Sequence, residues 1–400
     1  MKKSYLIHVI WAIVAVVAFV MGSKRIAGDA GVDVDDTGSR SGGRYAGRSV
    51  SGEPGGGEQN RMSTRVRRGV SSESSSGRSR KTALSESGIK SIGKLLQTST
   101  DPIERRIAFS RLLEGLTEEN AMLMREQLVH MSSSSPEWQE FHYAWGALAG
   151  QSSVEFGAES EKRDMAACFS GWVSANPAAA LAWFDSQPDD RRERGDLKWG
   201  AVYGLANTDT YGATQFVLQR ERSGDRQADD MIKIVASSVL RSGDIQDAAR
   251  WSQELPKGEV QDAAVREVAE DYVSEDPAKA VAWLESLPEG SAQMRGTEVA
   301  FSRWASRDAE AAIGRIDRMQ VSDLRDSAVR GYTQRIAYRD PSGSIELAST
   351  ISNPKLRDQT LVRVGRIYMQ RDKEAATRWL ANSNLAPGLQ KSIREFSRRR

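Results

Sequence analysis

The sequence contains very few of the residues that hold metal ions or cross-link a chain. Cys168 is its single cysteine, which excludes an internal disulfide and leaves the redox compartment of the protein open. The three histidines, His8, His130 and His142, are too few and too scattered for a zinc site with several side-chain ligands. We therefore expect no metal ion, no bound cofactor and no disulfide framework.

Strand-forming patterns are also scarce. No segment alternates convincingly between apolar and polar residues, and β-branched residues are few. Apolar residues recur instead at helical spacing from about residue 100 onward, first over 103–116, where Ile107, Leu112 and Leu113 are expected to share one apolar face. Another helix is predicted to open at Pro136. The expected fold class is all-α.

A unit of about 32 residues recurs through the second half of the chain. Its clearest copies lie at 172–183 and 272–283, where a proline follows Asn176 or Asp276. The residues that align with this proline are Pro177, Thr210, Ile245, Pro277, Ala309, Pro341 and Lys373. Such regular spacing predicts an α-solenoid, in which each repeat packs only on its neighbours.

Within a repeat, the residue types predict a helical hairpin. Asp276 is expected to cap a short helix over 277–287, because its side chain can accept backbone N–H bonds. Pro277 then occupies the first helical position, where its missing donor costs nothing. A longer helix is expected over 293–306, and breaks are expected near Pro188, Pro256, Pro288 and Pro341.

The repeat resembles the tetratricopeptide and Sel1-like family of bacterial helical repeats. The likeness is carried by Asp276-Pro277-x-x-Ala280-x-x-Trp283 and by the related motifs that end at Trp251 and Trp379, and it covers roughly residues 160–385. The spacing is 32 residues rather than about 34, and the family's Leu-Gly pair is missing. The resemblance therefore implies an α-solenoid architecture and carries over no peptide-clamp residue.

An apolar segment opens the chain. Residues 5–21 are apolar apart from His8 and are flanked by basic side chains, Lys2 and Lys3 before them and Lys24 and Arg25 after them. This pattern predicts entry into a membrane, with an uncleaved anchor favoured over a cleaved signal, which stays an alternative. We expect the rest of the chain to lie outside the cytoplasm, although the charge balance across the segment is close.

The next segment, residues 23–90, has the composition of a disordered linker. Glycine and serine make up 30 of the 78 residues at 23–100, which also carry 14 basic and 8 acidic side chains. Its arginines could contact anionic lipid, whereas nucleic-acid binding is disfavoured because only Tyr45 could stack on a base. The domain order predicted is therefore 1–22 membrane segment, 23–90 linker, 91–160 helical cap and 161–400 helical repeats.

Three motifs imitate catalytic sites without completing them. Residues 88–95 approach a phosphate-binding loop, but Leu95 stands where Ser or Thr would hold magnesium. Ser87-x-x-Lys90 and Ser91-x-x-Lys94 imitate a serine nucleophile with its lysine, yet the partner motifs are absent. We interpret this stretch as a solvated approach to the first helix.

The remaining candidate residues have structural interpretations. We expect His130 and His142 to be surface or packed histidines and Cys168 to be a buried small side chain. Six tryptophans at repeat-equivalent sites are expected to pack between helices, with a contribution to ligand binding left open. They are Trp172, Trp183, Trp251, Trp283, Trp304 and Trp379.

The sequence thus favours a membrane-tethered, non-catalytic scaffold that presents a surface to protein partners in the cell envelope. It assigns no catalytic, cofactor-binding or metal-binding residue and leaves the oligomeric state open. One alternative is an envelope enzyme acting on a glycan, with paired carboxylates among Asp271, Glu275 and Asp276. Another is a cytoplasm-facing scaffold whose basic linker contacts anionic lipid.

Overall fold

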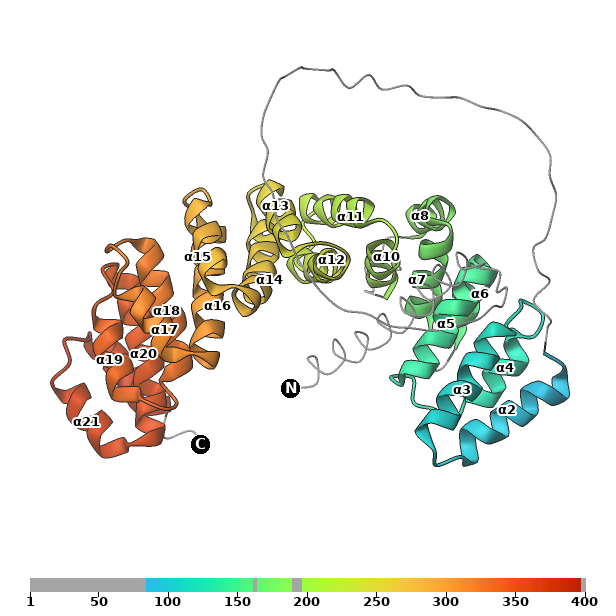
Figure 1. Ribbon diagram of the computed structural model, residues 1–400, viewed down its shortest axis with the longest axis horizontal. Coiled ribbons are helices and arrows are strands. Elements are labelled where there is room, and N and C mark those ends of the chain that lie inside the picture. Colours follow the sequence, from blue (N-terminus) through green and yellow to red (C-terminus); the bar gives the residue numbers. More distant parts are fainter. Residues whose placement is uncertain (1–83, 161–163, 189–195, 397–400) are drawn as a thin grey trace, which may run out of the picture. The chain divides into compact units, whose positions relative to one another are not determined.

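The computed structural model describes residues 84–160, 164–188 and 196–396 (Figure 1). Every regular element in these ranges is an α-helix and none is a strand, which confirms the all-α prediction. None of the described helices is long and apolar enough to cross a membrane. Residues 5–21 and most of the predicted linker lie outside the described ranges. The chain divides into two compact units, which meet in sequence at Gly115 and Leu116.

The first unit contains the helices α2 (Glu86–Thr98) and α3 (Pro102–Glu114). Among the described residues the first helix starts at Glu86, before the boundary near residue 91 that composition suggested. The predicted apolar face of α3 is wrong in one member, because Ile107 is 50% exposed while Leu112 is fully buried. Ala108 and Phe109, one and two positions further along, fill the core in its place, so the buried face is turned away from Ile107.

The second unit opens with α4 (Ala121–Leu128), α5 (Pro136–Ala149) and α6 (Gln151–Glu159). Helix α5 begins at Pro136 as predicted, and the Ser135 side chain caps it by accepting a hydrogen bond from the Trp138 N–H. Trp138 and Phe141 on α5 are fully buried. The aromatic residues of this segment therefore form the core at the start of the repeats.

Two kinds of helix then alternate along the chain. The main-layer helices are α7 (Met165–Ala175), α10 (Asp196–Ala206), α12 (Ala228–Ser242), α14 (Glu259–Glu275), α16 (Ser291–Arg307), α18 (Asp323–Ile336) and α20 (Pro354–Arg371). The capped helices are α8 (Pro177–Ser186), α11 (Thr210–Arg222), α13 (Ile245–Glu254), α15 (Pro277–Ser286), α17 (Ala309–Ile316), α19 (Pro341–Ser349) and α21 (Lys373–Ala381). Helix α22 (Pro387–Phe396) packs on α20. Figure 1 shows the alternation most clearly from α10 to α16.

Each of the seven residues aligned in the sequence is the first residue of a capped helix, which confirms the predicted period. The residue before each one is Asn or Asp, and its side chain accepts a backbone N–H two or three positions into the helix. These caps are Asn176, Asp209, Asp244, Asp276, Asp308, Asp340 and Asp372. The cap satisfies an otherwise unpaired donor and fixes where the chain turns.

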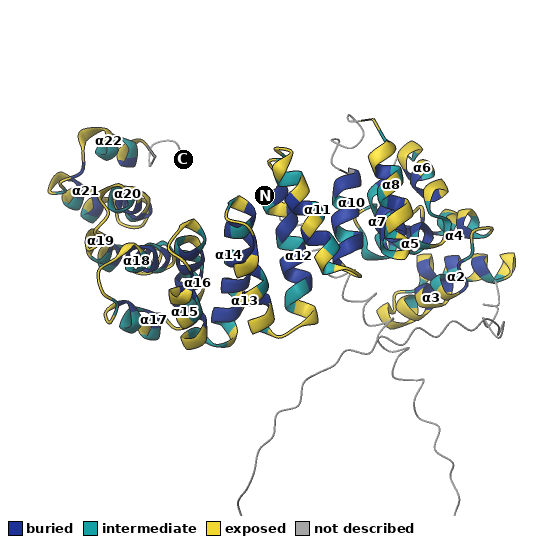
Figure 2. Ribbon diagram, turned by 90° about the horizontal axis from the view of Figure 1, so that it is seen from above, coloured by how far each residue is buried: buried dark blue, intermediate teal, exposed yellow. Residues whose placement is uncertain are grey.

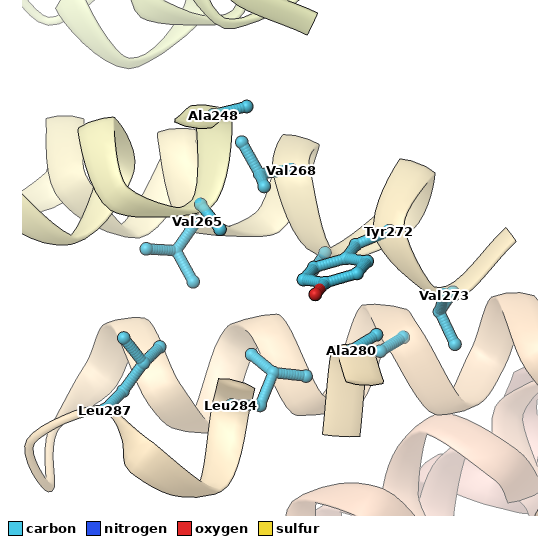
Figure 3. Packing of buried hydrophobic residues seen from close by; sticks show 11 residues of the cluster. Ala248, Val265, Val268, Tyr272, Val273, Ala280, Leu284 and Leu287 are labelled. Carbon is cyan, nitrogen blue, oxygen red and sulfur yellow. The ribbon is translucent and has the colours of Figure 1, made fainter. Parts of the chain in front are cut away.

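The core lies between the two kinds of helix. In the cluster of Figure 3, Val265 and Val268 of α14 share a buried core with Ala280 and Leu284 of α15. Helix α14 itself carries both buried and exposed residues (Figure 2). The fourth residue of every capped helix is small and no more than 1% exposed, so neighbouring helices can approach closely. These residues are Ala180, Ala213, Ala248, Ala280, Ala312, Ser344 and Ala376.

The repeat-equivalent tryptophans pack as the sequence predicted, although only Trp172 among them is buried and the other five are half-buried. An aromatic residue on a main-layer helix contacts a tryptophan eleven residues later on the capped helix. The ring centroids are 5.5 Å apart for Trp172 and Trp183, 5.9 Å for Tyr272 and Trp283, and 6.4 Å for Tyr368 and Trp379. Such pairs stabilise a hairpin beyond the area they bury.

Candidate interaction surface

The main-layer helices have a second face, turned away from the capped helices, which we call the open face. On α14, Val265, Val268 and Tyr272 point into the core shared with the capped helices. Glu267 and Glu270 lie on the opposite side of the same helix, as helical periodicity requires. The open face is defined by the residues three, six, seven, ten and eleven positions before the first residue of the next capped helix. Its residues range from buried ones such as Val235 and Gly331, which pack between neighbouring main-layer helices, to exposed ones such as Arg335 and Arg363.

Helix α14 gives the open face a strongly acidic segment. Its seventeen residues include six carboxylates and one arginine. Burial, followed by the charges of Glu270 and Asp271, raises the pKa of Glu267 above its ordinary value. Burial also raises the pKa of Asp271. We call Glu267, Glu270 and Asp271 the carboxylate patch, because these groups crowd one another and are incompletely neutralised.

Polar contacts join neighbouring main-layer helices along the open face. Arg303 of α16 lies 3.8 Å from the carboxylate of Glu270, and its Nε donates a hydrogen bond to Ser274 Oγ at 3.2 Å. Arg330 of α18 pairs in the same way with Glu298 of α16, at 3.3 Å. These exposed pairs each contribute little to stability. The two pairs show that Arg303 and Arg330 each extend toward a carboxylate on the preceding main-layer helix.

Beyond these pairs the open face becomes basic. Arg335 of α18 and Arg363 of α20 are exposed, and within the described ranges neither has an ion-pair or hydrogen-bonding side-chain partner. Arg366, three residues after Arg363, donates a hydrogen bond from Nη2 to Ser392 Oγ at 2.8 Å. Lys355 lies at the start of the same helix. We call Arg335, Arg363 and Arg366, which hold open-face positions, the arginine patch.

The charge counts of the sequence show the same separation. Residues 101–353 carry 28 basic and 42 acidic side chains, whereas residues 354–400 carry 12 basic and 4 acidic ones. The last repeat is thus basic in an otherwise acidic domain. The net charge of the whole repeat domain does not show this separation, whereas a count of charged residues in each repeat would have shown it.

The motifs that imitate catalytic sites do not form one. Residues 88–95 lie wholly within α2, so their backbone N–H groups are not arranged as a loop around a phosphate. Ser87, Lys90, Ser91 and Lys94 lie on the same helix, and Lys90 pairs with Glu86 at 2.5 Å. This stretch belongs to α2 itself and is not a solvated approach to a helix.

His142 belongs to a buried polar network that the sequence did not reveal. Asp164 accepts hydrogen bonds from Arg125 Nη2 at 2.9 Å and from Trp138 Nε1 at 2.5 Å. His142 lies fully buried between them, with Nε2 3.1 Å from Arg125 Nε and 3.2 Å from Asp164 Oδ2. Burial would raise the pKa of Asp164, but its contacts with His142, Trp138 and Arg125 outweigh burial and hold the pKa below its ordinary value. The network ties α4 and α5 to the start of α7.

The other singled-out residues are accounted for by packing and capping. Cys168 is fully buried, and burial, followed by the charge of Asp164, raises the pKa of its thiol, which disfavours the reactive thiolate. His130 is exposed at the end of α4. Asp276 caps α15 and pairs with Lys279 at 3.1 Å, so it is engaged in the turn.

No group of three or more His, Cys, Asp or Glu side chains within residues 84–160, 164–188 and 196–396 is placed to hold a metal ion. Comparisons of the chain with protein-family models, with curated proteins and with solved structures find no match. The open face, with its carboxylate patch on α14 and its arginine patch on α18 and α20, is therefore the candidate surface for binding.

Proposed function

We propose that this protein is a non-catalytic scaffold that binds protein partners through the open face of its main-layer helices. One observation carries the proposal. Arg335 and Arg363 are exposed on this face without an acidic partner in the described part of the chain. Solvated charges of one sign that gather on a rigid helical surface are suited to steering and orienting a partner of complementary charge.

The way the repeats are built supports this proposal. Caps and small buried residues fix the helices, so the open-face side chains stand on rigid elements rather than on mobile loops. Asp276, which a paired-carboxylate enzyme would need, is occupied as a helix cap. Binding without catalysis uses the features that are present: rigidity, exposure and segregated charge.

We further propose that residues 5–21 anchor the protein in a membrane and that residues 23–90 are a spacer between the anchor and the repeats. The apolar run with its flanking lysines and arginine supports the anchor. The Gly/Ser-rich composition supports the spacer. In this proposal the repeats lie outside the cytoplasm and reach partners in the cell envelope.

A site-specific photo-crosslinking experiment tests the binding surface. Benzoylphenylalanine replaces Tyr338, which is 57% exposed three residues after Arg335, or Tyr211, which is 74% exposed on the capped helix α11. Both substitutions exchange one exposed aromatic ring for another. Irradiation of cells of the source organism should link a protein to the residue-338 variant and not to the residue-211 variant. Equal crosslinking from both positions, or crosslinking from residue 211 alone, would refute a partner on the open face.

A further inference from the structure

Helix α3 of the first unit is apolar on two sides. One side carries the buried residues Ala108, Phe109 and Leu112, and the helix packs on α2. The other side carries Ile103, which is 69% exposed, and Ile107, which is 50% exposed and follows one turn later. A helix on the surface of a soluble domain usually has a single apolar stripe. The second apolar side of α3 is therefore available to a partner.

Exposed arginines flank the two isoleucines. Arg106 lies three positions after Ile103 and Arg111 lies four positions after Ile107, so each arginine neighbours one isoleucine on the helix surface. Neither arginine side chain has a partner in the part of the chain that the structure describes. We call Ile103, Arg106, Ile107 and Arg111 the α3 face. Apolar side chains beside unpaired cations are typical of helices that lie on an anionic lipid surface.

We propose that the α3 face docks on the anionic surface of the membrane in which residues 5–21 anchor the chain. This inference rests on the proposed function, since it needs the anchor, and it adds a second contact between the protein and the bilayer. Arginine suits this contact because its apolar stem can lie beside acyl chains while the guanidinium reaches the lipid phosphates. An interfacial helix with only two exposed apolar side chains binds weakly alone, and a second membrane signal makes such binding stable.

The position of α3 in the sequence favours lipid over a protein partner. Residues 22–83 separate the apolar segment from Leu84, where the described part of the chain begins. As the proposed spacer, a Gly/Ser-rich coil of this length would hold α3 within about 40–50 Å of the bilayer. Such tethering raises the effective concentration of the lipid surface at α3, so even a weak contact is formed much of the time.

The acidic side chains of α3 restrict the contact to the N-terminal part of the helix. Glu104 follows Ile103, and its carboxylate accepts a hydrogen bond from Ser99 Oγ at 2.5 Å. Glu114 is exposed at the end of the helix, seven positions beyond Ile107. We therefore expect the first turns of α3 to lie closer to the bilayer than its last turn.

The test places a nitrobenzoxadiazole fluorophore, whose emission shifts to the blue when it leaves water, on the full chain in nanodiscs. Ser110→Cys puts the label on the exposed side of α3, three residues after Ile107, whereas the native Cys168 is fully buried and protected from labelling. Emission should shift further to the blue in nanodiscs of equal parts phosphatidylcholine and phosphatidylglycerol than in nanodiscs of phosphatidylcholine alone. The protein labelled through Ser342→Cys, an exposed position on α19, should show no shift in either.

Two outcomes of this comparison would overturn the proposal. Equal emission from residue 110 in the two kinds of nanodisc would leave the α3 face to a protein partner. An equal shift at residues 110 and 342 would show that the label itself enters the lipid.

Variants of equal net charge test the role of the arginines. Arg106→Gln with Arg111→Gln should lose the blue shift at residue 110. The control, Arg318→Gln with Arg378→Gln, removes two exposed arginines of the repeats whose side chains have no partner in the described structure, and it should keep the shift. Circular dichroism verifies that both variants fold. A shift that survives in the first variant, or is lost equally in both, would refute docking through the arginines of α3.

A third variant tests the apolar part of the surface. Ile103→Ser with Ile107→Ser should also lose the shift, because charge alone does not carry residue 110 into the interface. An unchanged shift would refute docking through the isoleucines. Failure of the anchor is distinguishable from failure of this contact. A chain that does not co-purify with nanodiscs refutes the anchor and this inference with it, whereas a chain that co-purifies with an unshifted label refutes only the α3 contact.

Discussion

A close approach between two main-layer helices can be tested with a single methyl group. Gly331 of α18 faces the backbone of α16, where a Cβ atom at residue 331 would lie 2.0 Å from the carbonyl oxygen of Glu298. Ordinary contact for such an atom begins at 3.4 Å, so the two helices would have to separate by about 1.4 Å. The obstacle is backbone and cannot rotate away. We expect Gly331→Ala to be clearly destabilising.

The magnitude follows from two opposing terms. Replacing glycine with alanine inside a helix contributes about 0.5–1 kcal/mol of stability through backbone entropy. Forcing an extra carbon into a packed site costs about 1–3 kcal/mol and more where backbone must move. For Gly331→Ala the steric term should be the larger one, so the free energy of unfolding should fall by about 2 kcal/mol. A Cβ added at Gly314 of α17 would meet no atom within 4 Å, so Gly314→Ala should show the favourable term alone.

The assay is urea denaturation followed by circular dichroism at 222 nm, for the full chain in detergent micelles. Gly331→Ala should lower the midpoint and Gly314→Ala should raise it slightly. These two substitutions are chemically identical and differ only in what surrounds them. If both raised the midpoint, α16 and α18 would not be in backbone contact at residue 331, and the close packing of the main layer would be refuted.

Three further outcomes are expected. Ser344→Ala should raise the free energy of unfolding by about 1 kcal/mol, because the buried Ser344 hydroxyl has no hydrogen-bond partner in the structure and the other six repeats have alanine at this position. A lower denaturation midpoint for Ser344→Ala would contradict this prediction. Asp164→Asn should lower stability by about 3–5 kcal/mol at neutral pH by leaving Arg125 without its counter-ion. Because the folded pKa of Asp164 is lowered, its stabilising effect is present above the unfolded pKa of about 4 and is lost as pH falls through the folded pKa, so the gap between the two proteins should narrow in strong acid. The pKa of Glu267 is raised in the folded protein, so its ionised form destabilises the fold at pH values above that pKa. Glu267→Gln should therefore raise the melting temperature at pH 8 but not at pH 3. An equal rise at pH 8 and at pH 3 would show that the charge of Glu267 is not the cause.

The helix starts could be predicted from sequence because their chemistry is local. An Asn or Asp followed by a first-turn residue and a small residue four positions later is sufficient to place a capped helix, as at Asp276, Pro277 and Ala280. The same local logic placed α5 at Pro136. These predictions needed no knowledge of which helix packs against which.

The predictions that failed or were missed depend on tertiary neighbours. Ile107 belongs to a helical apolar pattern, yet it is exposed because Phe109 and Leu112 take the core side of α3. The network of Arg125, His142 and Asp164 joins residues up to 39 positions apart, and no repeat or motif links them in sequence. Helical spacing shows how wide an apolar face of a helix is, but it does not show which side of that face is covered by neighbouring helices.

When the repeats are compared position by position, the residues that build the fold can be distinguished from the residues that can give binding specificity. The fourth residue of the capped helices is alanine in six of seven repeats and serine in the other, because neighbouring helices must approach there. Seven positions before each capped helix, on the open face, three residues are serine and the other four are of four different types. They are Ser170, Tyr203, Ser238, Glu270, Ser302, Gln334 and Arg366.

Close packing of neighbouring helices imposes the same requirement on every repeat, so the core positions vary little from repeat to repeat. Glu270 and Arg366 belong neither to the caps nor to the buried apolar clusters of their repeats, so the packing of the hairpin does not dictate which residue type stands there. Chemical differences between otherwise equivalent repeats are therefore larger at the half-buried and exposed positions of the open face than in the core. A partner that binds across several repeats contacts this series of differences. The open face is for that reason the surface where recognition by this array is expected.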